Sequence, residues 1–272
     1  MRRTLRVIAV LVAAVLSAPA VLNAAPAEPK GHLVIVGGGG VPDIVLKRAI
    51  ELAGGPAARI VIFPQAAELA ETGDVNVEMW RKAGATNARW MALTDLPAAR
   101  AAVEEAAFIW FPGGDQTKLT AALKDTGLPE LIRKRYAAGA VVGGTSAGAA
   151  VMSSVMLTGD ADLLSITIGA TKTAPGLGLW PEAIVDQHFL KRQRHSRLIS
   201  LLLEHPDLVA VAIDEKTAVV VSGKRFDVIG ESTVLVLDAR KAKVEPRQAG
   251  QLGAAQGITL HVLTAGMGME YR

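Results

Sequence analysis

The chain has 272 residues, with 29 Lys and Arg against 26 Asp and Glu, a formal net charge of +3 and 0 Cys. Three arginines lie at its extreme N-terminus, so the remainder is close to neutral and carries no charge excess typical of nucleic-acid-binding proteins. The lack of cysteine excludes disulfides, thiol nucleophiles and thiolate metal sites.

Residues 1–27 predict a signal peptide for export. Basic residues at the start precede an apolar run from Val7 to Leu16, and Ala25-Pro26-Ala27 fits an A-x-A cleavage pattern. The cleavage point stays open between residues 20 and 27. A retained anchor is the alternative, but the run is shorter than the ~20 residues of a spanning helix. We therefore expect a periplasmic or secreted protein, free of the membrane after cleavage, with one domain over residues 28–272.

Apolar runs of strand length alternate with helical patterns through the first half of the chain. Near-continuous apolar strands separated by helices predict an α/β fold, with a mostly parallel sheet covered by helices on both faces. Glycines end three of these strands and mark the sheet edge at which active sites gather. The predicted strands are 32–40, 58–64, 88–93, 106–114 and 140–146, and the predicted helices include 42–54, 118–125 and 128–139.

The second half of the chain has a different pattern. One long helix is followed by short apolar strands with tight turns between them, then by a loop-like segment and a last strand. We see no internal repeat. The helix is expected at 191–206, the strands at 208–214, 217–223, 225–230 and 232–238, the loop at 239–258 and the last strand at 259–266.

A G-x-S-x-G pattern ends the strand at 140–146, with Ser146 between Gly144 and Gly148. This spacing suits a strand that turns sharply into a helix and exposes the serine hydroxyl at the turn. The pattern is short, and an idle serine in a glycine-rich connection would match it as well. A catalytic serine needs a base and an orienting carboxylate elsewhere in the chain.

His188 is the best placed of the five histidines to serve as that base, since it follows an apolar strand at a polar connection. Asp214 and Glu215 at a turn, and Asp186 two residues before His188, are the candidate carboxylates. A solvated turn is the alternative for the first two. The order Ser, His, Glu differs from the Ser, Asp/Glu, His order of α/β-hydrolases, which argues against a lipase or esterase.

Four blocks between Leu33 and Asp238 resemble the cyanophycinase family of serine peptidases, which is related to aspartyl dipeptidase. They are FPGGDQTKL, GGTSAGAAVMS, GLGLWPEAIVDQHFLKRQRHSRL and AVAIDEKTAVVV. The resemblance implies a flavodoxin-like fold related to class I glutamine amidotransferases, with serine in place of their cysteine. It also implies Ser146 as nucleophile, His188 as base, Glu215 as orienting carboxylate, and oxyanion donors at Gly114 and Ala147.

That family releases β-Asp-Arg dipeptides from cyanophycin, a poly-aspartate with arginine on each β-carboxylate. The resemblance implies an acyl-enzyme on Ser146 and no metal or other cofactor. Arginine forks bind carboxylates well, although a solvated basic helix face is the commoner role of such a run. Family members commonly form homodimers, and the sequence leaves the oligomeric state open. The residues implied in substrate binding are Gln116, Asp186, Gln187, Arg192, Arg194 and Arg197.

Two other functions stay open. An aspartyl or isoaspartyl dipeptidase would use the same three residues on short peptides. A non-catalytic binding domain of amidotransferase-like fold is the second, although the complete Ser, His and Glu set argues against it. The export signal departs from the family pattern, since cyanophycin is stored inside the cells that make it. The reaction class is therefore better defined by the sequence than the substrate.

Overall fold

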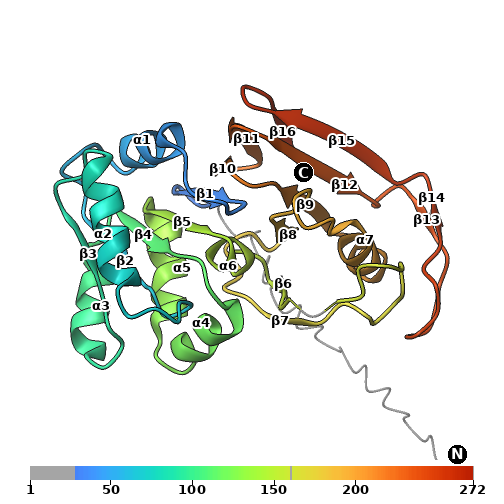
Figure 1. Cartoon of the computed structure of the whole chain (residues 1–272), viewed down its shortest axis with the longest axis horizontal. Coiled ribbons are helices and arrows are strands. Elements are labelled where there is room, and N and C mark those ends of the chain that lie inside the picture. The colour runs from blue at the N-terminus through green and yellow to red at the C-terminus, as the bar shows by residue number, and fades with distance from the viewer. Residues whose placement is uncertain (1–27, 160, 272) are drawn as a thin grey trace, which may run out of the picture.

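The computed structural model describes residues 28–159 and 161–271, so the predicted signal peptide lies outside the described residues. The largest element is an eight-stranded sheet (Figure 1). Five neighbouring strands are parallel, and three antiparallel strands extend the sheet beyond the first of them. In order across the sheet they are β16 (Gly268–Glu270), β11 (Arg225–Gly230), β10 (Thr217–Ser222), β1 (His32–Val36), β5 (Val141–Thr145), β4 (Phe108–Phe111), β2 (Ile60–Ile62) and β3 (Ala88–Trp90).

Both faces of this sheet are apolar, because the parallel strands are hydrophobic at successive positions that point to opposite sides. Leu33 and Ile35 of β1 pack in one core cluster, whereas Val34 and Val36 pack in another. The predicted α/β fold with helices on both faces is confirmed. The second cluster is covered by α1 (Asp43–Leu52) and α2 (Thr72–Lys82), and the first by α3 (Leu96–Glu105), α4 (Gln116–Leu123), α5 (Leu128–Ala138) and α6 (Ala147–Ala150).

A second, four-stranded sheet holds the elements that follow α6. Its strands β8 and β9 are parallel, while β12 and β15 continue it in antiparallel pairing. Figure 1 shows this sheet with α7 against it and α6 between it and the parallel strands. The elements are β8 (Ala183–Gln187), β9 (Val209–Ile213), β12 (Thr233–Asp238), β15 (Thr259–Thr264) and α7 (His195–Glu204), with the small ladders β6 (Val155–Leu157)–β7 (Thr173–Pro175) and β13 (Lys243–Val244)–β14 (Ala255–Gln256).

The second half differs from the prediction in four respects. The segment expected as a loop at 239–258 contains the two-stranded ladder β13–β14. The helix begins at His195 instead of residue 191, because Gln193 has a φ of 51° and interrupts a helical path. The short strands divide between two sheets, since the turn after β9 sends the chain from one sheet to the other. The segment at 259–266 is not the last strand, because β16 follows it and pairs with β11.

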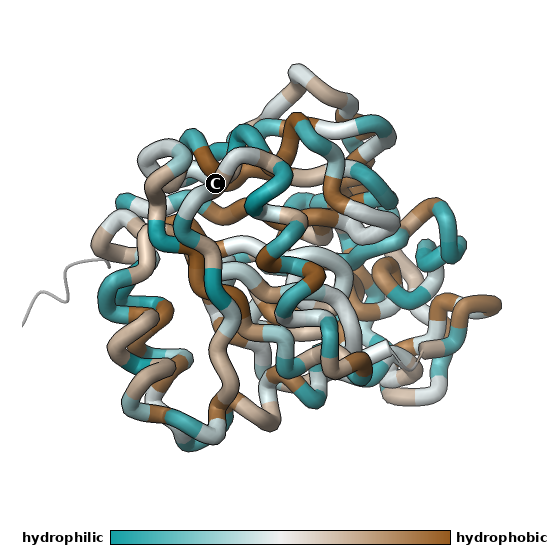
Figure 2. Tube along the Cα trace, turned by 60° about the vertical axis from the view of Figure 1, so that its left-hand side comes forward, coloured by the Kyte–Doolittle hydropathy of each residue, from teal (hydrophilic) through white to brown (hydrophobic). Residues whose placement is uncertain are grey.

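Hydrophilic and hydrophobic residues mix along the outer helices, as expected for helices with one packed face (Figure 2). In α1, for example, Val45, Leu46, Ala49 and Ile50 are buried and the intervening charged residues are exposed. Within residues 28–159 and 161–271, no helix combines the length and the apolar character that crossing a bilayer requires.

Candidate active site

Ser146 lies at a strained turn directly after β5. Its backbone has φ 55° and ψ −110°, and its N–H donates to the Val36 carbonyl across 3.1 Å. Glycine is required on both sides: a Cβ at 144 would lie 2.4 Å from the Gly148 carbonyl oxygen, and a Cβ at 148 would lie 2.0 Å from that of Phe111. The elbow geometry predicted from the sequence is therefore present, although α6 is only four residues long.

The Ser146 hydroxyl lies next to an imidazole that comes from the other sheet. Its Oγ is 2.8 Å from Nε2 of His188, and Nδ1 of that ring is 2.7 Å from Oε1 of Glu215. The carboxylate can accept only from a protonated Nδ1, which leaves Nε2 as the acceptor for the serine proton. This arrangement matches the nucleophile, base and orienting carboxylate of a serine hydrolase.

The glycine loop after β1, residues 37–40, packs directly on His188 and Glu215. A Cβ at Gly38 would lie 2.3 Å from Cε1 of His188, and a Cβ at Gly39 would lie 2.6 Å from Cβ of Glu215. Sequence reasoning used these glycines only to mark the sheet edge. The run of four glycines was the available signal, because a close backbone approach is one of the few reasons for such a run.

Burial lowers the pKa of His188 below its ordinary value of 6.5. The hydrogen bond to Glu215 works in the opposite direction, and the positive charges of Arg192 and Arg194 reinforce the effect of burial. The imidazole is therefore neutral at neutral pH, which is the form that can accept a proton from Ser146.

Asp214 and Glu215 are adjacent but have different partners. Asp214 accepts from the backbone N–H of Lys191 at 3.1 Å and from the Ser232 hydroxyl at 2.9 Å, so it fixes the turn between the two sheets. Glu215 contacts the imidazole of His188 instead. Of the carboxylates considered from the sequence, only Glu215 is in a position to orient the ring.

The predicted oxyanion donors lie on either side of Ser146. Gly114 has a φ of 139°, and a Cβ there would lie 2.0 Å from the Ala66 carbonyl oxygen, so only glycine fits. Ala147 begins α6 directly after the serine. Within the described residues neither of these two N–H groups donates to a protein acceptor. Their role as oxyanion donors stays a prediction.

Asp186 is fully buried and holds two arginines of the following turn and helix. Arg197 donates to both of its carboxylate oxygens, through Nε at 2.8 Å and through Nη2, and Nη1 of Arg194 lies 3.6 Å away. Arg194 also donates to the carbonyl and side-chain oxygens of Gln187 at 2.7 and 2.8 Å. Burial, reinforced by repulsion from Arg197, lowers the pKa of Arg194 to about 10, so it stays cationic at neutral pH.

The structure thus places most of the predicted substrate-binding groups inside the protein. Arg194 and Arg197 are 8% and 2% exposed, and the Gln116 amide donates to the carbonyls of Leu157 and Thr158 at 2.7 and 2.5 Å. Only Arg192 is exposed. Contact of these side chains with substrate stays a prediction.

A hollow of about 470 Å³ opens at Gly113, which is a spatial neighbour of Ser146. Gly113 and Gly114 form one wall, and a Cβ at Gly113 would lie 3.4 Å from Cβ of Ser146. The loop before α2 contributes Ala67, Glu68 and Leu69, the first residue of α2 contributes Thr72, and Asp115 completes the lining.

Hydrogen bonds connect Ser146 to His188 and His188 to Glu215 within an α/β fold. This is the arrangement of a serine-type peptidase, which is a hydrolase. The chain belongs to Peptidase family S51, whose model matches residues 33–229. The suspected relationship is confirmed by curated relatives. A cyanophycinase of Geminocystis herdmanii (strain PCC 6308) is 37% identical, over 80% of this chain and 83% of that one. A cyanophycinase of Trichormus variabilis (strain ATCC 29413 / PCC 7937) is 34% identical, over 80% and 76%.

Solved structures share the fold. A peptidase from an acI-B1 Actinobacterium has a TM-score of 0.63 at 24% identity, covering 90% of this chain and 98% of its own. A putative peptidase E protein from Listeria monocytogenes EGD-e has a TM-score of 0.56 at 18% identity, covering 74% and 99%. These likenesses agree with the flavodoxin-like fold expected from the sequence.

Proposed function

We propose that this protein is an exported cyanophycinase-type serine peptidase. It hydrolyses aspartyl-backbone bonds of cyanophycin through an acyl-enzyme on Ser146 and releases β-Asp-Arg dipeptides. The observation that carries the proposal is the continuous hydrogen-bonded path from the Ser146 hydroxyl through His188 to Glu215, with distances of 2.8 and 2.7 Å.

In the first half-reaction, Nε2 of His188 accepts the hydroxyl proton while Oγ of Ser146 attacks the scissile carbonyl carbon. Glu215 stabilises the imidazolium that results. The N–H groups of Gly114 and Ala147 donate to the oxyanion of the tetrahedral intermediate. The intermediate collapses to an acyl-enzyme when the imidazolium gives its proton to the leaving amine.

In the second half-reaction, water replaces the amine. Nε2 of His188 accepts a proton from the water as its oxygen attacks the ester carbonyl of acylated Ser146. A second tetrahedral intermediate forms in the same oxyanion site. Its collapse breaks the ester bond, returns the proton to the serine oxygen and releases the new carboxyl group.

The substrate is proposed from the relatives, because the two curated proteins named above are both cyanophycinases. Export is proposed from residues 1–27, and a leader implies that the enzyme meets the polymer outside the cytoplasm. Cell fractionation of the expressed full chain, with the intact mass of the purified protein, tests the leader: a mass that retains residues 1–27 would contradict it.

The activity is tested by incubating the purified protein with cyanophycin, with β-aspartyl dipeptides and with α-aspartyl dipeptides, and identifying the products by mass. Release of β-Asp-Arg from the polymer is expected, and the Ser146→Ala variant is the control. Cleavage of dipeptides alone would identify an aspartyl dipeptidase. A folded protein that cleaves none of the three substrates would point to a binding domain.

A further inference from the structure

The hollow beside Ser146 is lined by two acidic residues. Glu68 comes from the loop before α2, and Asp115 comes from the turn that joins β4 to α4. The other lining residues, which are Ala67, Leu69, Thr72, Gly113 and Gly114, carry no charge. A group that enters from the scissile bond therefore meets two carboxylates and an uncharged wall.

Each carboxylate has one oxygen engaged and one available. Oδ1 of Asp115 caps α4, accepting from the N–H and the hydroxyl of Thr117 at 2.7 and 2.5 Å. Oε1 of Glu68 accepts from Nζ of Lys118 at 2.8 Å. Across the part of the chain that the structure describes, Oδ2 of Asp115 and Oε2 of Glu68 have no hydrogen-bond partner.

Both groups are anionic at neutral pH. The hydrogen bond from Thr117 holds the pKa of Asp115 below its ordinary value, and the hydrogen bond from Lys118 does the same for the pKa of Glu68. Lys118 compensates one of the two charges, so the hollow keeps an excess of negative charge next to the nucleophile.

We propose that Glu68 and Asp115 are specificity-determining residues that bind a guanidinium group of the substrate in this hollow. The inference rests on the proposed function, because it places there the arginine attached to the β-carboxylate of the aspartate at the scissile bond. A planar guanidinium offers five N–H donors, enough to reach the free oxygens of both carboxylates. The uncharged wall packs against the aliphatic stem.

The arginine of the substrate would then contact two kinds of side chain, cationic at its α-carboxylate and anionic at its guanidinium. The α-carboxylate of the same arginine is left for a cationic partner, and Arg192 is the exposed arginine near His188. The guanidinium goes to the acidic hollow that Glu68 and Asp115 line. The ion pairs of Asp186 with Arg194 and Arg197 are buried.

The test compares two synthetic aspartate tetrapeptides, one with arginine and one with citrulline on each β-carboxylate. Citrulline replaces the guanidinium by an uncharged urea of nearly the same shape. We expect the wild-type kcat/KM to favour arginine about tenfold or more, the range of one charge-assisted contact. The double variant Glu68→Gln, Asp115→Asn should lose this preference, mainly through the arginine substrate. Asparagine keeps the capping oxygen of α4, so the fold is retained.

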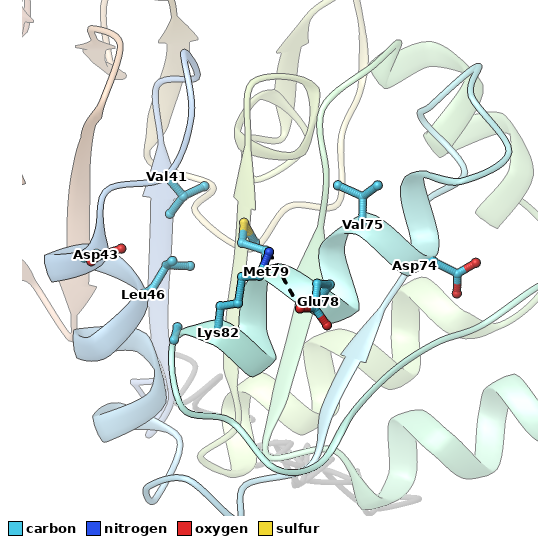
Figure 3. A pocket seen from close by; sticks show the side chains of 9 residues that line it. Val41, Asp43, Leu46, Asp74, Val75, Glu78, Met79 and Lys82 are labelled. Atoms are coloured by element: carbon cyan, nitrogen blue, oxygen red, sulfur yellow. Dashed lines mark ion pairs between the residues drawn. The ribbon is translucent and has the colours of Figure 1, made fainter.

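A matched control lies in a second groove, between α1 and α2 (Figure 3). Glu78 lines it and pairs with Lys82 at 3.7 Å, as Glu68 pairs with Lys118, yet the groove contains none of the site residues. Glu78→Gln should leave the preference unchanged. Lys118→Gln should increase it, because Oε1 of Glu68 is then also free.

A double variant that keeps the wild-type preference would overturn the inference. If the wild type cleaves neither peptide, the proposed function fails. The inference is then decided by titration calorimetry of both peptides with Ser146→Ala, alone and combined with the two substitutions. Tighter binding of the arginine peptide that disappears with the two carboxylates would support the hollow, and equal affinities would reject it.

Discussion

The nucleophile and its two partners come from regions that are built differently. Ser146 follows β5 in the parallel part of the large sheet, and glycines within two residues of it set its geometry. His188 and Glu215 follow β8 and β9, which are parallel neighbours in the second sheet and therefore end at the same edge. Local sequence therefore determines the geometry of Ser146. His188 and Glu215 reach Ser146 only because the two sheets meet at that edge.

The glycine loop after β1 is the contact between the two regions. The Gly37 carbonyl accepts from the N–H of His188 at 2.7 Å, and the Gly38 carbonyl accepts from that of Lys216 at 2.8 Å. A Cβ at Gly37 would lie 2.1 Å from the Asp214 carbonyl oxygen. The loop thus holds both partner residues by backbone contacts, which makes the alignment with Ser146 sensitive to a single added methyl group.

The largest expected effect comes from removing the nucleophile. Ser146→Ala should lower kcat by on the order of 10⁴-fold or more, and His188→Ala should be nearly as damaging. The double variant should be hardly worse than either, since the residues act as a unit. Hydrolysis rates of the purified variants, with thermal melts to show that each is folded, test this. Near-normal activity of Ser146→Ala would remove this residue from the mechanism.

The two adjacent carboxylates of the turn should differ strongly in effect. Glu215→Gln removes the anion that stabilises the imidazolium and should reduce kcat on the order of 10³-fold, a milder loss than Ser146→Ala. Asp214→Asn keeps a hydrogen-bonding group for Lys191 and Ser232, so activity should be nearly unchanged. The same rate measurements separate the two: a dead Asp214→Asn enzyme that folds normally would move the orienting role to residue 214.

One added methyl group is expected to disrupt the contact between the glycine loop after β1 and the His188 ring. Gly38→Ala should lower kcat about 10²-fold, because the Cβ would lie 2.3 Å from the imidazole and would displace it from Ser146. Gly40→Ala is the matched control: both glycines have a φ of 99°, but a Cβ at 40 meets nothing within 4 Å. Equal losses in both variants would attribute the effect to backbone strain and not to the ring.

The same division explains what the sequence could predict. Apolar strands, helical periodicity and the G-x-S-x-G spacing are local signals, and they located the parallel sheet and the strained turn at Ser146. The separation of the C-terminal strands into two sheets depends on long-range packing, which no turn signal reports. The inward orientation of Arg197 also depends on packing between elements, since its partner Asp186 lies 11 residues away on another element. A basic run looks alike whether its members face solvent or a buried carboxylate.

The smallest expected effect sharpens the comparison by changing only the electrostatics of the histidine side. Because burial lowers the pKa of His188, the acid limb of kcat/KM should fall below pH 6.5. Activity is then lost as falling pH protonates the imidazole. Arg192→Ala removes a positive charge that helps to lower this pKa, so its acid limb should move to higher pH. An uncharged activated ester, measured at low salt, avoids any role of Arg192 in substrate binding and limits screening.

Lys191→Ala removes a neighbouring exposed charge and should leave the profile unchanged. Identical acid limbs in wild type and Arg192→Ala would show that burial alone determines the protonation of the base.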